Sequence, residues 1–311
     1  MERIQKPLLE VSDLSVSFRM YDSGLEQKQL PVISSLSLKV LPGEILAVAG
    51  SSGSGKSLLA SAILGILPGN ATVSGSLRFD GEPLTPERQA KLRGTEIALV
   101  PQSVAFLDPL MKVGAQVDGH RKPRPTERRR KLFRRFGLPE QTERLYPFQL
   151  SGGMARRVLV STALLTSARL IIADEPTPGM SLEQAEEALA MFRAMADEGK
   201  GVVLITHDID LAFHIADRIA VFYAGTTVET APAADFRQGP EALRHPYSKA
   251  LWRALPQHEF RPIPGFQPYA GNLPSGCLFA PRCPCRTAEC EKSVPPMQTV
   301  RKGEVRCFHA T

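Results

Sequence analysis

One eight-residue stretch restricts the fold of this chain more than any other. Residues 50–57 read GSSGSGKS, which matches the pattern G-x-x-x-x-G-K-[ST]. They stand between an apolar run at 44–50 and a helical apolar pattern at 56–67. A glycine-rich loop in that context turns backbone N–H groups inward and places a helix N-terminus beside an anion. The stretch therefore predicts a strand–loop–helix unit that binds phosphate groups.

Every residue of this loop is a candidate ligand for a nucleotide. The Lys56 ammonium suits the β- and γ-phosphates, and the Ser57 hydroxyl suits Mg²⁺. The remaining expected contacts come from Gly50, Ser51, Ser52, Gly53, Ser54 and Gly55. A flexible linker rich in glycine and serine would need neither the lysine nor the flanking strand and helix.

Apolar periodicity predicts an α/β fold around this loop. Alternation at 8–18 and 33–40 predicts half-buried antiparallel strands. Buried strands are predicted at 170–174 and 201–206, with an amphipathic helix at 181–199 between them. That strand–helix–strand order implies a parallel sheet with right-handed crossovers.

The stretch LIIADE at 170–175 ends a buried strand with two acids. A carboxylate at that place can hold Mg²⁺, usually through water, which suits Asp174. Glu175 is then placed to polarise an attacking water. The motif is weak alone, because apolar runs often end in acids, and it gains specificity beside a phosphate loop.

The stretch LSGGM at 150–154 opens an apolar helix. Ser151, Gly152 and Gly153 can offer a hydroxyl and free N–H groups to a second anion. Taken alone, the same residues are also an ordinary helix cap.

Composition and the distribution of apolar residues indicate the cellular compartment of the chain. The chain has 311 residues, 43% of them hydrophobic, and a formal net charge of +6, which is ordinary for a globular protein. The start carries Glu2, Arg3 and Lys6 and no apolar h-region, and no stretch approaches 18 apolar residues. We therefore expect neither a signal peptide nor a membrane span, and a cytosolic chain with reduced thiols.

Five cysteines lie in a proline-rich tail of little periodicity, beyond a domain boundary that we place near residue 238. Four of them have the spacing C-x5-C-x6-C-x16-C, and Cys285 lies within the set. Structural zinc sites usually show tighter pairs, and four thiolates in loops also suit a [4Fe–4S] cluster. Spacing alone leaves open an iron–sulfur cluster, zinc, or cysteines without metal. A metal would act as a staple for the tail. The four are Cys277, Cys283, Cys290 and Cys307.

The segment at 120–137 is strongly basic and is predicted to be helical from Thr126, a possible N-cap, to Gly137. It can meet anionic lipid headgroups, or it can be a solvated face with Leu132, Phe133 and Phe136 packed inward. We expect no nucleic-acid binding, because no reading motif accompanies the charge.

The ordered set of motifs resembles the ATPase subunit of ATP-binding cassette (ABC) transporters. The set is GSSGSGKS, VPQ at 100–102, LSGGM, LIIADEPT at 170–177 and ITHD at 205–208, and the resemblance covers residues 8–230. It implies two subunits that face each other head to tail, with ATP between the phosphate loop of one and the LSGG of the other.

The resemblance also implies roles for single residues. Gln102 would touch Mg²⁺ and couple to membrane subunits, and His207 would contact the γ-phosphate. Phe18 or Tyr21 would stack on adenine. One departure stands at PGMSL, 178–182, where Ser181 replaces the aspartate that the family places there to align the two halves of the dimer.

The tail resembles that of the dipeptide, oligopeptide and nickel import ATPases. The similar stretches are RHPYSKALWRALP at 244–256 and GCLFAPRCP at 276–284, with ILGILPG at 63–69 in the core. This branch implies a [4Fe–4S] cluster on the four spaced cysteines, with zinc as the alternative.

We therefore expect an α/β fold: an ABC ATPase core at 1–238, with a parallel sheet, an antiparallel β subdomain and a helical subdomain at about 103–160, and a small cysteine-rich extension at 239–311. The expected function is ATP hydrolysis that powers import of peptides, nickel or a related solute, at the cytoplasmic face of the bacterial inner membrane. Expected partners are a second ATPase subunit of different sequence, two permease subunits and a solute-binding protein. The alternatives are a soluble ABC ATPase in DNA repair or translation, and an ATP-sensing regulator.

Overall fold

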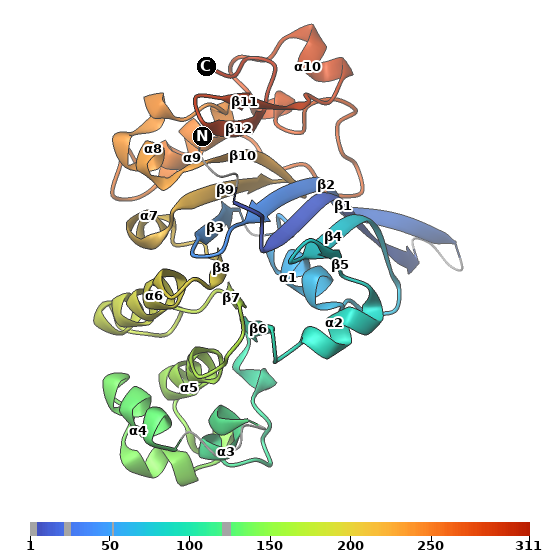
Figure 1. The fold of residues 1–311 in the computed structure, drawn as a ribbon. Coiled ribbons are helices and arrows are strands. Elements are labelled where there is room, and N and C mark those ends of the chain that lie inside the picture. Colours follow the sequence, from blue (N-terminus) through green and yellow to red (C-terminus); the bar gives the residue numbers. More distant parts are fainter. Residues whose placement is uncertain (1–4, 22–25, 52, 120–125) are drawn as a thin grey trace.

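The computed structural model describes residues 5–21, 26–51, 53–119 and 126–311. Its larger sheet has eight described strands in the order β11-β12-β10-β9-β3-β8-β7-β6 (Figure 1). Strands β9, β3, β8, β7 and β6 run parallel. They are β3 (Ile45–Gly50), β6 (Ile97–Val100), β7 (Leu170–Asp174), β8 (Gly201–Ile205) and β9 (Arg218–Tyr223). Their continuous apolar runs are buried on both faces, as parallel strands require.

A second sheet of four described antiparallel strands has the order β2-β1-β4-β5. Strands β1 and β2 confirm the two strands predicted from alternation at 8–18 and 33–40, although both are longer than expected. A β-bulge between Val11 and Leu14 interrupts the alternation of β1. Asp13 lies in it, exposed and with a φ of 50°, and the bulge brings Leu14 back to the buried face. The strands are β1 (Leu9–Tyr21), β2 (Gln27–Val40), β4 (Ala71–Phe79) and β5 (Glu82–Pro83).

Helices cover the sheets and form a separate group at one end, where α3, α4 and α5 lie together (Figure 1). In basic α4, Phe133 packs inward, as the solvated-face interpretation predicts, and Leu132 is half-buried. Phe136 is buried just beyond the end of the helix at Arg135. Arg129 is also buried, where it pairs with Asp118 and Glu143. The cationic stretch at 120–125 lies outside the described residues.

The helices of the core are α1 (Lys56–Leu64), α2 (Pro86–Leu92), α3 (Val113–Asp118), α4 (Thr126–Arg135), α5 (Gly152–Leu164), α6 (Leu182–Asp197) and α7 (Ile209–Ile215). Short 3-10 turns lie at Val104–Phe106, Glu140–Arg144, Pro147–Gln149, Pro240–Ala242 and Ala280–Arg282. No described helix is both long enough and apolar enough to cross a bilayer.

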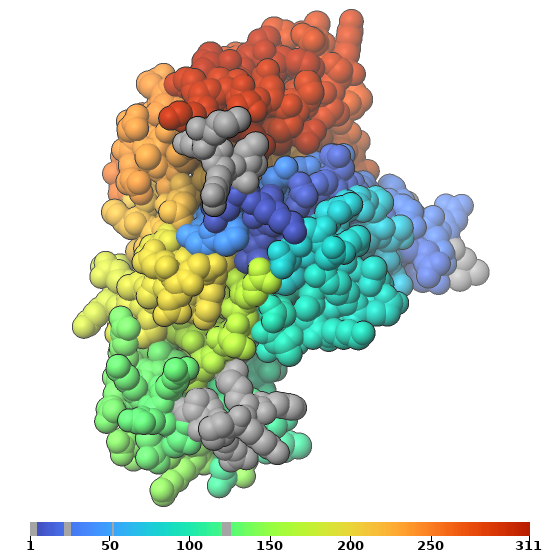
Figure 2. Space-filling model, in the orientation of Figure 1, coloured from blue at the N-terminus to red at the C-terminus, as the bar shows by residue number. Residues whose placement is uncertain are grey.

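Residues 239–311, called the extension here, share the core of the larger sheet. Strand β12 pairs with β10, so that Val305 lies opposite Glu229. Tyr247 and Phe279 are buried in the same apolar cluster as the parallel strands. Figure 2 shows the extension, in orange and red, as one mass with the core. The weak periodicity of this segment did not predict such packing.

The elements of this region are β10 (Thr226–Pro232), α8 (Ala233–Gln238), α9 (Pro246–Ala254), α10 (Ala288–Lys292), β11 (Met297–Val300) and β12 (Gly303–Arg306).

Candidate functional site

The phosphate loop, residues 50–57, joins β3 to α1 as predicted. A Cβ at Gly50 would lie 2.4 Å from the Phe222 carbonyl oxygen, so only glycine allows this close approach. Gly53 and Gly55 have φ angles of 76° and 92°, in the left-handed region that glycine adopts freely. Ser52, a predicted ligand, lies outside the described residues. The loop is thus a tight turn that directly precedes a helix N-terminus.

The Lys56 ammonium lies inside this loop. Its Nζ donates to the carbonyl oxygens of Gly50 at 2.8 Å and Ser51 at 3.0 Å. Burial lowers the pKa of Lys56, and the nearby Glu175 and Asp174 carboxylates oppose that shift. A buried cation that is held by neutral carbonyls can turn to phosphate oxygens as stronger partners.

Asp174 ends β7, and its side chain is buried. Burial raises the pKa of Asp174, and a hydrogen bond from the Ser57 hydroxyl opposes the rise. Its Oδ1 is buried and has no hydrogen-bond partner among the described residues. An unpaired carboxylate oxygen beside a serine hydroxyl is the oxygen donor set that Mg²⁺ prefers. These residues therefore fit the ion that the sequence predicts.

Glu175 adopts a left-handed backbone conformation with a φ of 49°. Its Oε2 lies 2.7 Å from Nδ1 of His207, and its backbone N–H donates to the Ile205 carbonyl at 2.9 Å. The Glu175 side chain is 9% exposed and that of His207 is 67% exposed. Strain of this kind concentrates at functional sites. The structure thus brings the predicted carboxylate and histidine into direct contact.

Gln102 is exposed, in the loop after β6. Arg156 of α5 donates to the Pro101 carbonyl at 3.0 Å and also to the Gln102 carbonyl. Burial lowers the pKa of Arg156, and Glu175 and Asp174 oppose the shift, so this cation faces the acidic pair. Sequence reasoning assigned Arg156 no role, although it lies just after LSGGM. It is a positioning residue for the Gln102 loop.

The signature, residues 150–154, opens α5 as predicted. Ser151 is the N-cap and accepts from the Met154 N–H at 3.3 Å, while Ser151 and Gly152 are exposed. A Cβ at Gly153 would lie 3.0 Å from the Gly179 carbonyl, so glycine lets the loop after β7 approach. In Figure 1, α5 packs with α3 and α4, whereas α1 lies beside the antiparallel sheet. The exposed signature is thus available to a second molecule.

Ser181, at the position of the missing aspartate, caps α6. Its hydroxyl accepts from the Gln184 N–H, and the Gln184 side chain accepts from the Ser181 N–H, both at 3.4 Å. This capping box gives the serine a local structural role.

The two aromatic candidates for adenine stacking lie on β1. Phe18 is half-buried, and Tyr21 is 65% exposed at the end of the strand. Either assignment stays a prediction.

The extension reaches the phosphate loop, which the sequence did not predict. The Ser51 hydroxyl donates to Oε1 of Gln267. The Tyr247 hydroxyl also shares hydrogen bonds with Ser51, and these oppose the rise that burial causes in the pKa of Tyr247. No motif signals this contact, because it joins residues about 200 positions apart only in the folded chain.

The four spaced cysteines gather in the fold. Burial raises the pKa of Cys307 to about 11, and the thiols of Cys277, Cys283 and Cys290 add to that rise. Cys285 is exposed, and its thiol adds to the raised pKa of Cys283 but not to the raised pKa of Cys277 or Cys307. Within the part of the chain that the structure describes, no three metal-ligating side chains stand close enough to hold one ion.

Known proteins resemble this chain over most of its length. A family described as ABC transporter matches residues 33–178, and a family described as oligopeptide/dipeptide transporter, C-terminal region, matches residues 228–290. The dipeptide transport ATP-binding protein DppD of Haemophilus influenzae is 35% identical, with coverage of 96% of this chain and 94% of the relative. The oligopeptide transport ATP-binding protein OppD of Salmonella typhimurium is 34% identical, with coverage of 97% and 93%.

Solved structures agree on the fold. The dimeric structure of MJ0796, a bacterial ABC transporter cassette, has a TM-score of 0.62 and 25% identity, and it covers 72% of this chain and 98% of that chain. A post-hydrolysis state of the same cassette, bound to ADP and Pi, matches equally well.

Proposed function

The chain belongs to the family of ATP-binding subunits of dipeptide and oligopeptide ABC transporters, and on that premise we propose that it hydrolyses ATP to power peptide import through a membrane complex. The observation that carries the proposal is the convergence of Lys56, Asp174 and Glu175 beside the phosphate loop. These groups supply the charges that phosphoryl transfer to water needs.

We assign the following roles at this site. The loop N–H groups and Lys56 bind the phosphates of ATP, while Ser57, Asp174 and Gln102 would hold Mg²⁺, which would neutralise charge on the phosphates. Glu175, oriented by His207, accepts a proton from the attacking water. His207 also contacts the γ-phosphate. A second molecule offers Ser151, Gly152 and Gly153 to the same nucleotide.

The test compares Glu175→Gln and Lys56→Ala with the wild type in the complex assembled with its permease subunits. We expect Glu175→Gln to bind ATP normally but to release phosphate at least about 100-fold more slowly, because it lacks the general base. Lys56→Ala should lose ATP binding itself. Wild-type complex that binds ATP without hydrolysis would instead support an ATP-sensing regulator.

The solute is proposed to be a peptide, because the relatives are named for dipeptides and oligopeptides. Nickel is the weaker proposal, which rests only on resemblance of the tail. Identification of the ligand in the cognate solute-binding protein decides between them. A soluble repair or translation ATPase is disfavoured, because the relatives are named as transport ATP-binding proteins and the extension matches a transporter C-terminal region.

We propose that the complex lies at the cytoplasmic face of the bacterial inner membrane. It would contain two permease subunits, a solute-binding protein, and a second ATPase subunit of different sequence. Ser181 supports unequal subunits, because it lacks the carboxylate that would align the partner's site. Purification of the complex and identification of its chains by mass spectrometry would test this composition.

We propose that Cys277, Cys283, Cys290 and Cys307 hold a [4Fe–4S] cluster. Their mutual influence supports a common site, and a cluster needs wider thiol spacing than a single ion because each thiolate binds a different iron. Zinc is the alternative and would need all four thiols around one ion. Anaerobic purification followed by iron, sulfide and zinc analysis distinguishes the two, and absence of both would refute a metal staple.

A further inference from the structure

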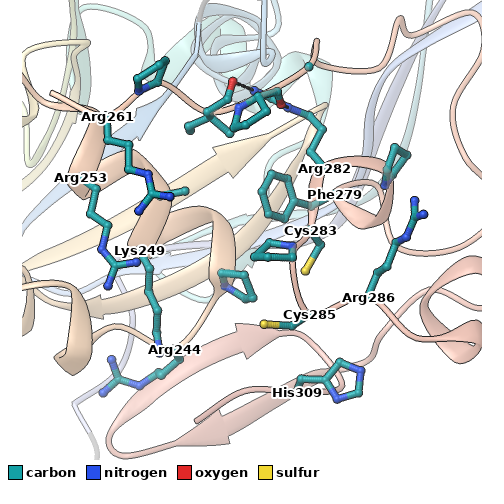
Figure 3. Close-up of a pocket in the computed structure, with 18 of the residues that line it drawn as sticks. Arg244, Lys249, Arg253, Arg261, Phe279, Arg282, Cys283, Cys285, Arg286 and His309 are labelled. Atoms are coloured by element: carbon teal, nitrogen blue, oxygen red, sulfur yellow. Dashed lines mark hydrogen bonds between the residues drawn. The ribbon is translucent and has the colours of Figure 1, made fainter. Parts of the chain in front are cut away.

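A wide cationic pocket lies in the extension (Figure 3). One wall is α9 and the segment after it, and the other is the cysteine-rich segment, residues 276–290. The volume is about 820 Å³, which falls in the range of small-molecule pockets. Six cationic side chains line it, and no Asp or Glu does: Arg244, Lys249, Arg253, Arg261, Arg282 and Arg286.

Some of these cations have structural partners. Arg244 is fully buried and pairs with Glu229 at 3.3 Å and Asp235 at 2.7 Å. Arg253 pairs with Glu241 at 2.9 Å. These ion pairs stabilise the wall of the pocket and partly neutralise Arg244 and Arg253, so the two arginines attract an anionic ligand less strongly.

Arg286 also has a partner, Glu291, at 3.9 Å. The remaining three cations, Lys249, Arg261 and Arg282, have no carboxylate partner within ion-pair distance among the described residues. Nζ of Lys249 donates to the Thr311 hydroxyl at 2.9 Å, and Arg282 donates to backbone carbonyls, that of Pro264 at 2.8 Å among them. Positive charge that is gathered in a concave site focuses the field on an anion.

We propose that this pocket binds a small anion that carries at least two phosphate or carboxylate groups. Lys249 and Arg261 approach from one wall and Arg282 from the other (Figure 3), so separate anionic groups can be held at once. Arginine forks match phosphate and carboxylate geometry. Prolines stiffen both walls, which limits the ordering cost of binding: Pro246, Pro262, Pro264, Pro281 and Pro284.

The pocket also connects to the phosphate loop. Arg282 donates hydrogen bonds to the carbonyl oxygens of Ile263 and Pro264. Gln267, three residues after Pro264, accepts a hydrogen bond from the Ser51 hydroxyl. An anion that draws Arg282 toward itself acts on the segment that contacts the loop. Bound anion and ATP therefore change each other's affinity by the same factor.

The test is isothermal titration of the full-length chain with tripolyphosphate and with citrate, without divalent cations. A Lys56→Ala background removes binding at the phosphate loop. We expect saturable binding of at least one anion, and at least about tenfold weaker binding in Lys249→Gln/Arg261→Gln, because two charge-assisted contacts are lost. Tripolyphosphate alone would indicate a phosphate ligand, and citrate alone a carboxylate.

The matched control is Lys131→Gln/Arg134→Gln, which removes two exposed cations from α4 and should bind as the parent does. Equal weakening in both double variants would show general charge attraction and overturn the proposal. So would the absence of saturable binding tighter than about 1 mM. The single tryptophan, Trp252 on α9, gives a fluorescence signal beside the pocket as a second readout.

Discussion

At the scale of single residues, the site holds charged groups that lack good partners in the unliganded chain. Asp174 keeps a buried oxygen without a hydrogen bond, Lys56 is bound only by neutral carbonyls, and Glu175 is strained. A nucleotide with Mg²⁺ would give Lys56 phosphate oxygens and Asp174 a cation as partners. The residues are thus arranged for the bound state at a cost to the free chain.

Ser181 gives a prediction at this scale, because it caps α6 where the family has an aspartate. Ser181→Ala should lower the free energy of unfolding by about 1 kcal/mol, since the cap is lost. Ser181→Asp should keep that stability, because aspartate caps equally well, and should add the carboxylate that the partner site lacks. Chemical denaturation measures the first effect, and ATPase rates of the assembled complex measure the second. Equal stability of the alanine and aspartate variants would contradict the capping role.

At the scale of elements, buried charges and a buried histidine join the extension to the core. Glu229 on β10 is fully buried and accepts from the backbone N–H groups of Arg244 and His245, which precede α9. His245 caps α9 by accepting from the Tyr247 N–H at 2.9 Å. The sheet edge therefore fixes where this helix begins.

The Glu229–Arg244 pair predicts a large and specific loss. Glu229→Gln should lower the free energy of unfolding by about 3 kcal/mol, because a buried arginine loses one of its carboxylates. The double variant Glu229→Gln/Arg244→Met should recover part of that loss. Thermal unfolding followed by circular dichroism is the measurement, and a double variant less stable than both single variants would argue against an uncompensated charge.

His245 predicts a pH dependence. Burial lowers the pKa of His245 to about 3, below the value of about 6.5 in an unfolded chain. Below pH 6.5 the His245 imidazole binds a proton in the unfolded state but stays neutral in the folded state. Stability is thus fully present above about pH 6.5 and falls by up to about 1.4 kcal/mol per pH unit as the pH drops toward 3.

His245→Asn tests this dependence, because asparagine can still cap α9 but does not titrate. Its free energy of unfolding should change less steeply between pH 6.5 and 4.5 than that of the wild type, whatever its absolute stability. Identical slopes would show that His245 is not the group responsible.

At the scale of the whole molecule, the extension and the ATP site are one packed unit. Phe279 of the cysteine-rich segment lies against Tyr247, and Tyr247 contacts Ser51. Three adjoining side chains therefore connect the extension to the phosphate loop. This is physical contact between the two regions, which coupling requires.

Gln267 allows a direct test of that contact. Gln267→Leu frees the Ser51 hydroxyl from a bond made in the unliganded chain, so ATP affinity should rise about fivefold, the worth of one hydrogen bond. Gln257→Leu, an exposed glutamine of the same extension, should leave affinity unchanged. Equilibrium binding of a fluorescent ATP analogue gives both values. Unchanged or weaker binding in Gln267→Leu would mean that the bond persists when ATP binds.

The sequence by itself determined the local units. Local motifs predicted the backbone conformation of their own segments, because each motif depends on neighbours within a few residues. Examples are the glycines and lysine of 50–57, the acids after LIIA and the alternation at 8–18. The LIIADE motif beside a phosphate loop then predicted Asp174 and Glu175 at the site, and the resemblance to ABC ATPases implied His207 there. In the fold, all three lie at the carboxyl ends of neighbouring parallel strands.

Only the tertiary structure decided the contacts between distant segments. These contacts leave no periodic signal in the sequence, because each pairs residues whose separation along the chain is arbitrary. They are the contacts of Arg156 with the Gln102 loop, of Gln267 and Tyr247 with Ser51, and of β12 with β10. For the cysteines, the sequence named four candidates and left Cys285 as an extra thiol, and packing turned Cys285 outward while it gathered the other four. Burial and partner choice are properties of the folded core, and no local pattern contains them.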